Sequence, residues 1–142
     1  MLGGLGRLLR MLGIDCSSFS GHTEELLVSA KREGRIILTR NTHLKCRRGV
    51  IFISSQRLID QLKDLNREYD IRKNANPLSR CLLCNKELLP VAKEDVKDQI
   101  PYYTYLHFDE FYQCPGCNRI YWNGSHRKGM ERRIRRIVDA LN

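Results

Sequence analysis

The sequence contains no apolar run near the roughly 18 residues that a helix needs to cross a bilayer. A signal peptide is excluded as well, because Arg7 and Arg10 interrupt the apolar N-terminal stretch MLGGLGRLLRMLGIDC and no small-residue cleavage site follows it. Low-complexity segments are absent, and so are internal repeats other than two CxxC pairs. These absences predict a globular protein that is neither secreted nor membrane-bound.

Acidic residues are in short supply. The chain has 16 of them against 25 lysines and arginines, which gives a net charge of +9 over 142 residues. A surface with this charge attracts polyanions, and RNA or DNA is the leading candidate partner. A soluble basic protein without a nucleic-acid partner is the alternative. The length accommodates one compact domain or two small ones.

Helices and strands alternate in the first half of the chain. Apolar residues recur at helical spacing before Gly13, between Thr23 and Gly34, and from Leu58 to about Tyr69. Two short β-branched runs, RIILT at 35–39 and VIFIS at 50–54, have the pattern of buried strands. This order predicts an α/β fold with a parallel sheet.

The second half has a different character. The turn-rich stretch NANPLS marks a boundary, after which short segments, aromatic residues and CxxC turns follow. The C-terminal stretch has an apolar stripe at helical spacing and four arginines between its members. We therefore predict an α/β domain over residues 1–76, a zinc ribbon over 77–124 and a basic C-terminal helix over 125–142.

Four of the six cysteines form two CxxC pairs, Cys81 with Cys84 and Cys114 with Cys117. Each two-residue gap lets both thiolates reach one ion, so the four predict a closed, structural Zn²⁺ site. Disulfides and a thioredoxin-like redox pair are the alternatives. Cysteines paired for metal binding indicate a reducing compartment, which predicts an intracellular protein, cytoplasmic or nuclear. The long spacer between the pairs predicts an insertion, KEDVKDQIPYY, that projects from the ribbon.

Aromatic residues are concentrated around the cysteine pairs. Exposed aromatic rings stack on the bases of single-stranded nucleic acids, whereas buried ones fill the core of a small ribbon. The sequence leaves both roles open. The residues concerned are Tyr102, Tyr103, Tyr105, Phe108, Phe111, Tyr112, Tyr121 and Trp122.

Five stretches of the chain stand out together: MLGGLGRLLRMLGIDC, EELLVSAKREGRIILTRN, CLLC, VAKEDVKDQIPYY and FYQCPGCNRIYWNGSH. They resemble the Mut7-C domain, a PIN-like ribonuclease domain fused to a zinc ribbon. The resemblance covers nearly the whole chain and is most specific from Cys114 to His126. It implies a PIN-like three-layer α/β/α sheet for residues 1 to about 75, RNA as the substrate, and catalytic Mg²⁺ or Mn²⁺ at a carboxylate cluster.

The resemblance also implies which acids hold the catalytic metal. Asp15 matches a family acid, and Glu24 or Glu25 substitutes for another. Asn41 and Thr23 stand where the family commonly has acids. The family also has a strand ending in an aspartate before the MLG motif, so we expect the complete domain to have one upstream of the first residue.

We therefore predict a Mut7-C-type RNA-processing protein. The complete domain is expected to be a metal-dependent ribonuclease, with cleavage weakened or absent in this chain. The alternatives are a non-catalytic zinc-ribbon module that binds RNA or acts as an adaptor, and a ribbon that binds only proteins. The arginines expected to contact phosphates, if they are not simply solvated, are Arg7, Arg10, Arg40, Arg132, Arg133, Arg135 and Arg136.

Overall fold

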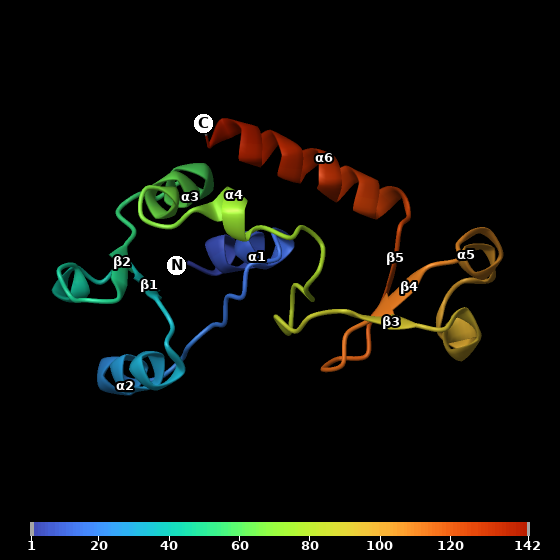
Figure 1. Ribbon diagram of the computed structural model, residues 1–142, viewed down its shortest axis with the longest axis horizontal. Coiled ribbons are helices and arrows are strands. Elements are labelled where there is room, and N and C mark those ends of the chain that lie inside the picture. Colours follow the sequence, from blue (N-terminus) through green and yellow to red (C-terminus); the bar gives the residue numbers. More distant parts are fainter. Residues whose placement is uncertain (1, 142) are drawn as a thin grey trace.

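A computed structural model describes residues 2–141 and has two regions that meet beside the first helix (Figure 1). The N-terminal region contains a two-stranded parallel sheet, with α2 on one side of it and α1 and α3 on the other. Its elements are α1 (Gly3–Met11), α2 (Thr23–Glu33), β1 (Ile37–Thr39), η1 (Thr42–Leu44), β2 (Val50–Phe52), α3 (Leu58–Asn66) and α4 (Ile71–Asn74).

The first helix is amphipathic, as its leucine spacing predicts. Leu5, Leu8, Leu9 and Leu12 are all buried, and they form one core with residues of β2, α3, α4 and α6. The helix ends at Gly13, whose φ of 76° is in the left-handed region that favours glycine. The predicted helix and its C-terminal stop are both confirmed.

The two parallel strands are shorter than the sequence predicts. Ile37 pairs with Val50 and Thr39 with Phe52, so each strand has three residues. The predicted first strand also included Arg35, but its backbone N–H donates to the carbonyl of Ala30 at 2.8 Å. Arg35 therefore belongs to the end of α2, and the sheet begins two residues later.

The second region is a three-stranded antiparallel sheet of β3 (Leu89–Val91), β4 (Phe111–Gln113) and β5 (Ile120–Trp122). Between β3 and β4 the chain forms η2 (Lys93–Gln99) and α5 (Tyr102–His107), which confirms the predicted insertion. A small separate core fills this region, and its buried members are Val96, Ile100 and Phe111.

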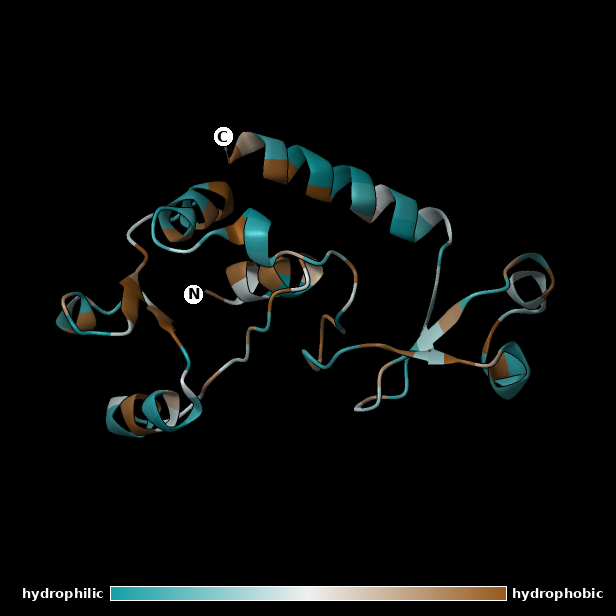
Figure 2. Ribbon diagram, viewed as in Figure 1, coloured by the Kyte–Doolittle hydropathy of each residue, from teal (hydrophilic) through white to brown (hydrophobic). Residues whose placement is uncertain are grey.

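The C-terminal helix α6 (Ser125–Ala140) begins directly after the ribbon and returns to the N-terminal region (Figure 1). Its apolar stripe faces the other helices, whereas its outer face is polar (Figure 2). Ile134 is 5% exposed within the N-terminal core, and Arg72 donates to the carbonyl of Val138 at 3.0 Å. The helix thus packs on α1, α3 and α4 residues across the molecule.

These elements confirm a mixed α/β fold with a parallel sheet, a separate antiparallel sheet and a C-terminal helix. Within residues 2–141, every helix is too short or too polar to cross a bilayer. The three-part division at 76 and 124 stays a prediction. Its outer ends, Met1 and Asn142, lie outside the described residues.

Candidate functional site

Four cysteine sulfurs meet between two turns of the ribbon. Those of Cys81, Cys84, Cys114 and Cys117 all lie within 4.8 Å of one another, and the Cys81 and Cys117 sulfurs are 3.8 Å apart. A tetrahedral zinc ion with Zn–S bonds of about 2.3 Å places its sulfurs about 3.8 Å apart. The donor set and its spacing therefore fit the predicted zinc site, and zinc bound there would hold the two turns together.

The two turns, CLLCN and CPGCN, have the same backbone geometry. The N–H of Asn85 donates to the carbonyl of Cys81, and that of Asn118 to the carbonyl of Cys114, each at 2.9 Å. Both asparagines have a positive φ, 64° and 62°, which asparagine tolerates better than most residues. In the second turn the N–H of Gly116 also points at the sulfur of Cys114, at 3.3 Å. The asparagine after each pair is a signal that the sequence reasoning missed.

The surroundings of the sulfurs shift their acidity in opposite directions. Burial disfavours the Cys81 thiolate, but hydrogen bonds from the Tyr121 hydroxyl and from the N–H groups of Cys84 and Leu83 outweigh it and lower its pKa to about 6. The neighbouring sulfur of Cys117 is the main cause that raises the pKa of Cys84 to about 12. Four crowded thiolates repel one another unless a cation lies between them, which is the role of a bound divalent metal.

The first cysteine turn is docked on the end of α1. Arg10 donates to the carbonyls of Leu82 and Cys16, at 2.9 and 2.7 Å. The side chain of Asn85 donates to Asp15 at 2.7 Å and accepts from the N–H of Cys16 at 3.0 Å. The turn that would hold zinc is therefore also the turn that positions the loop after α1.

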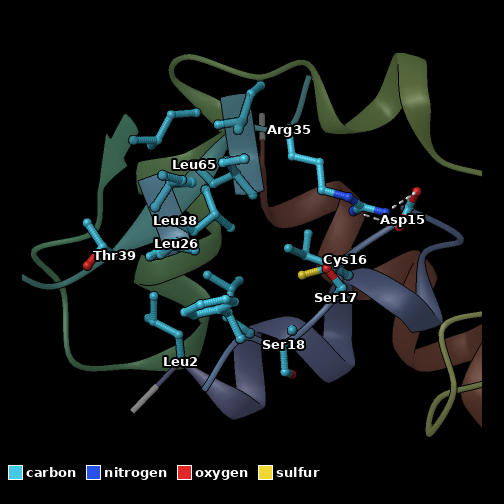
Figure 3. Close-up of a pocket in the computed structure, with 18 of the residues that line it drawn as sticks. Leu2, Asp15, Cys16, Ser17, Ser18, Leu26, Arg35, Leu38, Thr39 and Leu65 are labelled. Atoms are coloured by element: carbon cyan, nitrogen blue, oxygen red, sulfur yellow. Dashed lines mark hydrogen bonds and ion pairs between the residues drawn. The ribbon is translucent and has the colours of Figure 1, made fainter. Parts of the chain in front are cut away.

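Asp15, the predicted metal-binding acid, already has partners on both carboxylate oxygens. Arg35 donates to Oδ1 at 3.1 Å and to Oδ2 at 3.2 Å (Figure 3). Asn85 donates to Oδ1 as well. Burial opposes the charge of Asp15, but the hydrogen bonds from Asn85 and Arg35 prevail and hold its pKa below the ordinary 3.8. This carboxylate is therefore an ion-pair partner in the described geometry.

Glu24 and Glu25 begin α2, and both are exposed. Within residues 2–141, the four cysteines are the only group of three or more His, Cys, Asp or Glu side chains close enough to hold a metal ion. With Asp15 bound by Arg35, these three acids do not fit a catalytic Mg²⁺ or Mn²⁺ in this arrangement. Their catalytic role stays a prediction.

A groove of about 1080 Å³ lies between α1, α2 and β1 (Figure 3). Leu2, Leu26 and Leu38 contribute apolar side chains, and the pair of Asp15 and Arg35 lies at its border. The rest of the lining mixes apolar and polar side chains, serines and a threonine among them. The predicted acids Glu24 and Glu25 are not part of this lining.

The open edge of β1 also borders the groove. The N–H of Ile37 donates to Gly49 and the carbonyl of Thr39 accepts from Ile53, so these two residues direct their backbone groups toward β2. Because the direction of the backbone N–H and C=O groups alternates along a strand, those of Leu38 point away from β2 and toward the groove. The groove therefore offers backbone hydrogen bonds as well as apolar contacts.

The arginines expected to contact phosphates have different surroundings. Arg10 is half-buried and donates to the two carbonyls named above. Arg40 donates to the carbonyl of Ser54 at 3.5 Å, and Arg7 is exposed. The remaining four are exposed on α6, and none of them forms an ion pair with another of the described residues. These four are Arg132, Arg133, Arg135 and Arg136.

The aromatic residues divide into two groups. Phe111 is buried in the ribbon core, with Trp122 packed beside it at a ring separation of 6.4 Å. Tyr121 contacts the sulfur of Cys81 at 3.3 Å. Tyr102 and Tyr103, in contrast, are 71% and 67% exposed. Core packing, one of the two roles left open by the sequence, is therefore present, whereas base stacking by the exposed rings stays a prediction.

The family model described as the Mut7-C RNAse domain matches residues 1–134. The chain belongs to this family. The match confirms the predicted resemblance, and Mut7-C membership supports a nuclease-like or RNA-processing role. No curated protein and no solved structure matches the chain.

Three residues of this Mut7-C chain were missed by sequence reasoning. Arg35 lies inside a predicted strand, whereas Asn85 and Arg80 lie beside the first cysteine pair. The side chain of Arg80 donates to the carbonyls of Gly13 and Asn85, at 3.3 and 2.7 Å. No local pattern identifies these contacts, because the partners are up to 70 residues apart in sequence.

Proposed function

We propose that this Mut7-C chain binds RNA and acts in RNA processing, with the outer face of α6 in contact with the phosphate backbone. The observation that carries the proposal is the set of four exposed arginines on that face, none of which has an ion-pair partner among the described residues. Arginine recognises phosphate by charge and by two parallel hydrogen bonds. Such contacts position a nucleic acid without reading its sequence.

The packing of α6 supports this orientation. Ile134 and Met130 lie against the N-terminal core, so the helix cannot rotate to bury its arginines. Side chains three or four residues apart lie on one side of a helix, which brings Arg132, Arg135 and Arg136 together. The proposal includes a reducing, intracellular compartment, because four zinc-binding thiolates oxidise outside one.

Salt-dependent RNA binding tests the proposal. Anisotropy of a labelled single-stranded RNA is measured across a salt series for the parent and for Arg132→Gln/Arg135→Gln. Each lost phosphate contact reduces the slope of log affinity against log salt by about 0.7 for single strands. The double variant is therefore expected to lose about 1.4 of that slope.

The matched control removes the same charge elsewhere. Arg47→Gln/Arg48→Gln changes two exposed arginines of the loop before β2 and should leave most of the slope in place. Equal losses in the two variants would mean that RNA responds to net charge alone. No salt-dependent affinity in the parent would reject RNA binding altogether.

Hydrolysis of RNA is the second candidate, and membership of an RNAse family favours it. Cleavage of the same RNA is followed with Mn²⁺ for the parent and for Asp15→Asn. Because Asp15 is already paired with Arg35, we expect no Mn²⁺-dependent cleavage by either protein. We also expect the variant to bind RNA with the same affinity as the parent. Cleavage by the parent that Asp15→Asn abolishes would establish the ribonuclease in place of the binding module.

A further inference from the structure

Tyr102 and Tyr103, the two most exposed large hydrophobic residues of the described chain, lie on α5 with exposed Leu106, at the end of the molecule away from the parallel sheet (Figure 1). Tyr102, Tyr103 and Leu106 are 71%, 67% and 53% exposed, and we call them the tyrosine patch. Exposed aromatic groups of this kind mark interaction surfaces more often than scattered single residues do. The patch is part of the insertion between β3 and β4.

The patch is not needed to hold the insertion together. The inner side of α5 is filled by Thr104, which is buried, and by Tyr105, which packs on the ribbon core beside Val96. None of the three patch residues belongs to that core. These three side chains are therefore exposed to solvent and do not contribute to the core of the insertion.

One of the tyrosines is held in a fixed position. The ring of Tyr103 stacks on His107 with 4.0 Å between centroids and an angle of 18°. The Nδ1 atom of His107 lies 2.9 Å from the carbonyl oxygen of Tyr103, within hydrogen-bond distance. An aromatic ring that is already ordered loses little conformational entropy when a partner binds to it.

The insertion that carries the patch has a net charge opposite to that of the whole chain. Between β3 and β4 the sequence has five acidic side chains against two lysines, although the chain carries +9. Lys93 lies over the ring of Tyr105 at 4.8 Å and pairs with Asp109 at 3.3 Å, and Lys97 lies over the same ring. The acids that form no ion pair with another described residue, all of them exposed, are Glu94, Asp95, Asp98 and Glu110.

We propose that the tyrosine patch is a docking surface for a basic protein segment whose arginines stack on Tyr102 and Tyr103 and pair with the flanking carboxylates. Arginine is attracted to the face of a tyrosine ring, and its planar group also binds carboxylates in pairs of hydrogen bonds. The exposed acids of the insertion attract such a segment and repel phosphate groups, which disfavours RNA at this place. The inference is independent of the RNA-binding proposal for α6.

Chemical-shift mapping by NMR tests the proposal on the zinc-loaded chain. Fluorescence anisotropy measures the affinities. The probe is an octa-arginine peptide, with octa-lysine and octa-glutamate as comparisons. We expect octa-arginine to shift the amides of Tyr102, Tyr103 and Leu106 at concentrations where octa-glutamate does not. Lysine has no planar group to stack, so octa-lysine should bind several-fold more weakly.

Variants separate the patch from general electrostatics. Tyr102→Ala/Tyr103→Ala keeps every acid and should weaken octa-arginine binding by about five- to thirtyfold, because each exposed cation–π contact contributes about two- to fivefold. Val28→Ala, an exposed apolar residue of α2, is the matched control and should leave the affinity unchanged. Both substitutions alter exposed side chains, and unchanged zinc content verifies that each variant folds.

Three results would overturn the proposal. Equal affinity for the two cationic peptides, unaffected by the tyrosine variant, would mean that the acids alone attract them. Shifts of the same amides by a single-stranded RNA would assign the patch to nucleic acid. Concentration-dependent shifts of these amides without any peptide would assign it to a second copy of the chain.

Discussion

Gly13 is the position where one added methyl group should do most damage. It ends α1 with a φ of 76°, and a Cβ there would overlap the carbonyl oxygen of Asn76 and lie 2.7 Å from the hydroxyl of Ser79. A left-handed backbone costs an alanine roughly 1–2 kcal/mol relative to glycine. The displaced carbonyl also accepts from the Ser79 hydroxyl at 2.6 Å, and the N–H of Asn76 donates to Leu12 at 2.9 Å.

Each of these hydrogen bonds contributes about 0.5–1.5 kcal/mol. Gly13→Ala should therefore lower the free energy of unfolding by about 3 kcal/mol, which lowers the melting temperature by about 10 °C for a chain of this size. Thermal unfolding is followed by circular dichroism with zinc present in excess. The strain arises where the boundary segment before the ribbon crosses the end of α1.

Gly34→Ala provides the matched control. Gly34 has a similar φ of 66°, but a Cβ there would meet nothing within 4 Å. This variant should lose only the backbone component, about 1 kcal/mol. Equal losses for the two variants would refute the reasoning, because they would mean that backbone conformation matters and the contact with Asn76 does not.

Three further predictions concern zinc, a buried acid and α6. Cys81→Ser should abolish stoichiometric zinc binding measured by metal analysis, whereas Cys46→Ser, at an exposed cysteine outside the cluster, should not. Burial opposes the charge of Asp64, but hydrogen bonds from Ser55 outweigh it and lower the Asp64 pKa. The Asp64 carboxylate therefore stabilises the fold at pH values above its ordinary pKa of 3.8. This stabilisation disappears as the pH falls through the lower pKa of Asp64 in the folded protein. In urea titrations at a series of pH values, Asp64→Asn should remove this pH-dependent part of the free energy of unfolding. Ile134→Ala should cost about 2–4 kcal/mol in the same assay, and a loss below 1 kcal/mol would mean that α6 is not docked as described.

The sequence predicts what local patterns encode. The leucine spacing of α1, the stop at Gly13 and each CxxC pair depend on residues a few positions apart, and the structure has each of them. The first strand begins later than predicted because Arg35, although it precedes an apolar run, donates its N–H to the end of α2. Hydropathy alone does not distinguish a strand residue from a helix end that continues into a strand.

The environment of Asp15 could not be predicted in the same way. The sequence shows an acid in a position suited to metal, but its partners, Arg35 and Asn85, are 20 and 70 residues away. A carboxylate that lies near a guanidinium and an amide has its charge satisfied before any metal arrives. Only the folded arrangement distinguishes an ion-pair partner from a metal ligand.

The side chain of Asn85 connects the two regions through hydrogen bonds to Asp15 and Cys16. The left-handed conformation of Asn85 closes the Cys81 turn, and the side chain of the same residue holds the loop after α1 from two sides. An interaction that holds the cysteine turn in place therefore also helps to hold Asp15 in place. The turn itself would be held by a cation that neutralises its thiolates. It follows that zinc would stabilise the N-terminal region without touching it, because the loss of the turn would remove the hydrogen bonds that Asn85 forms with Asp15 and Cys16.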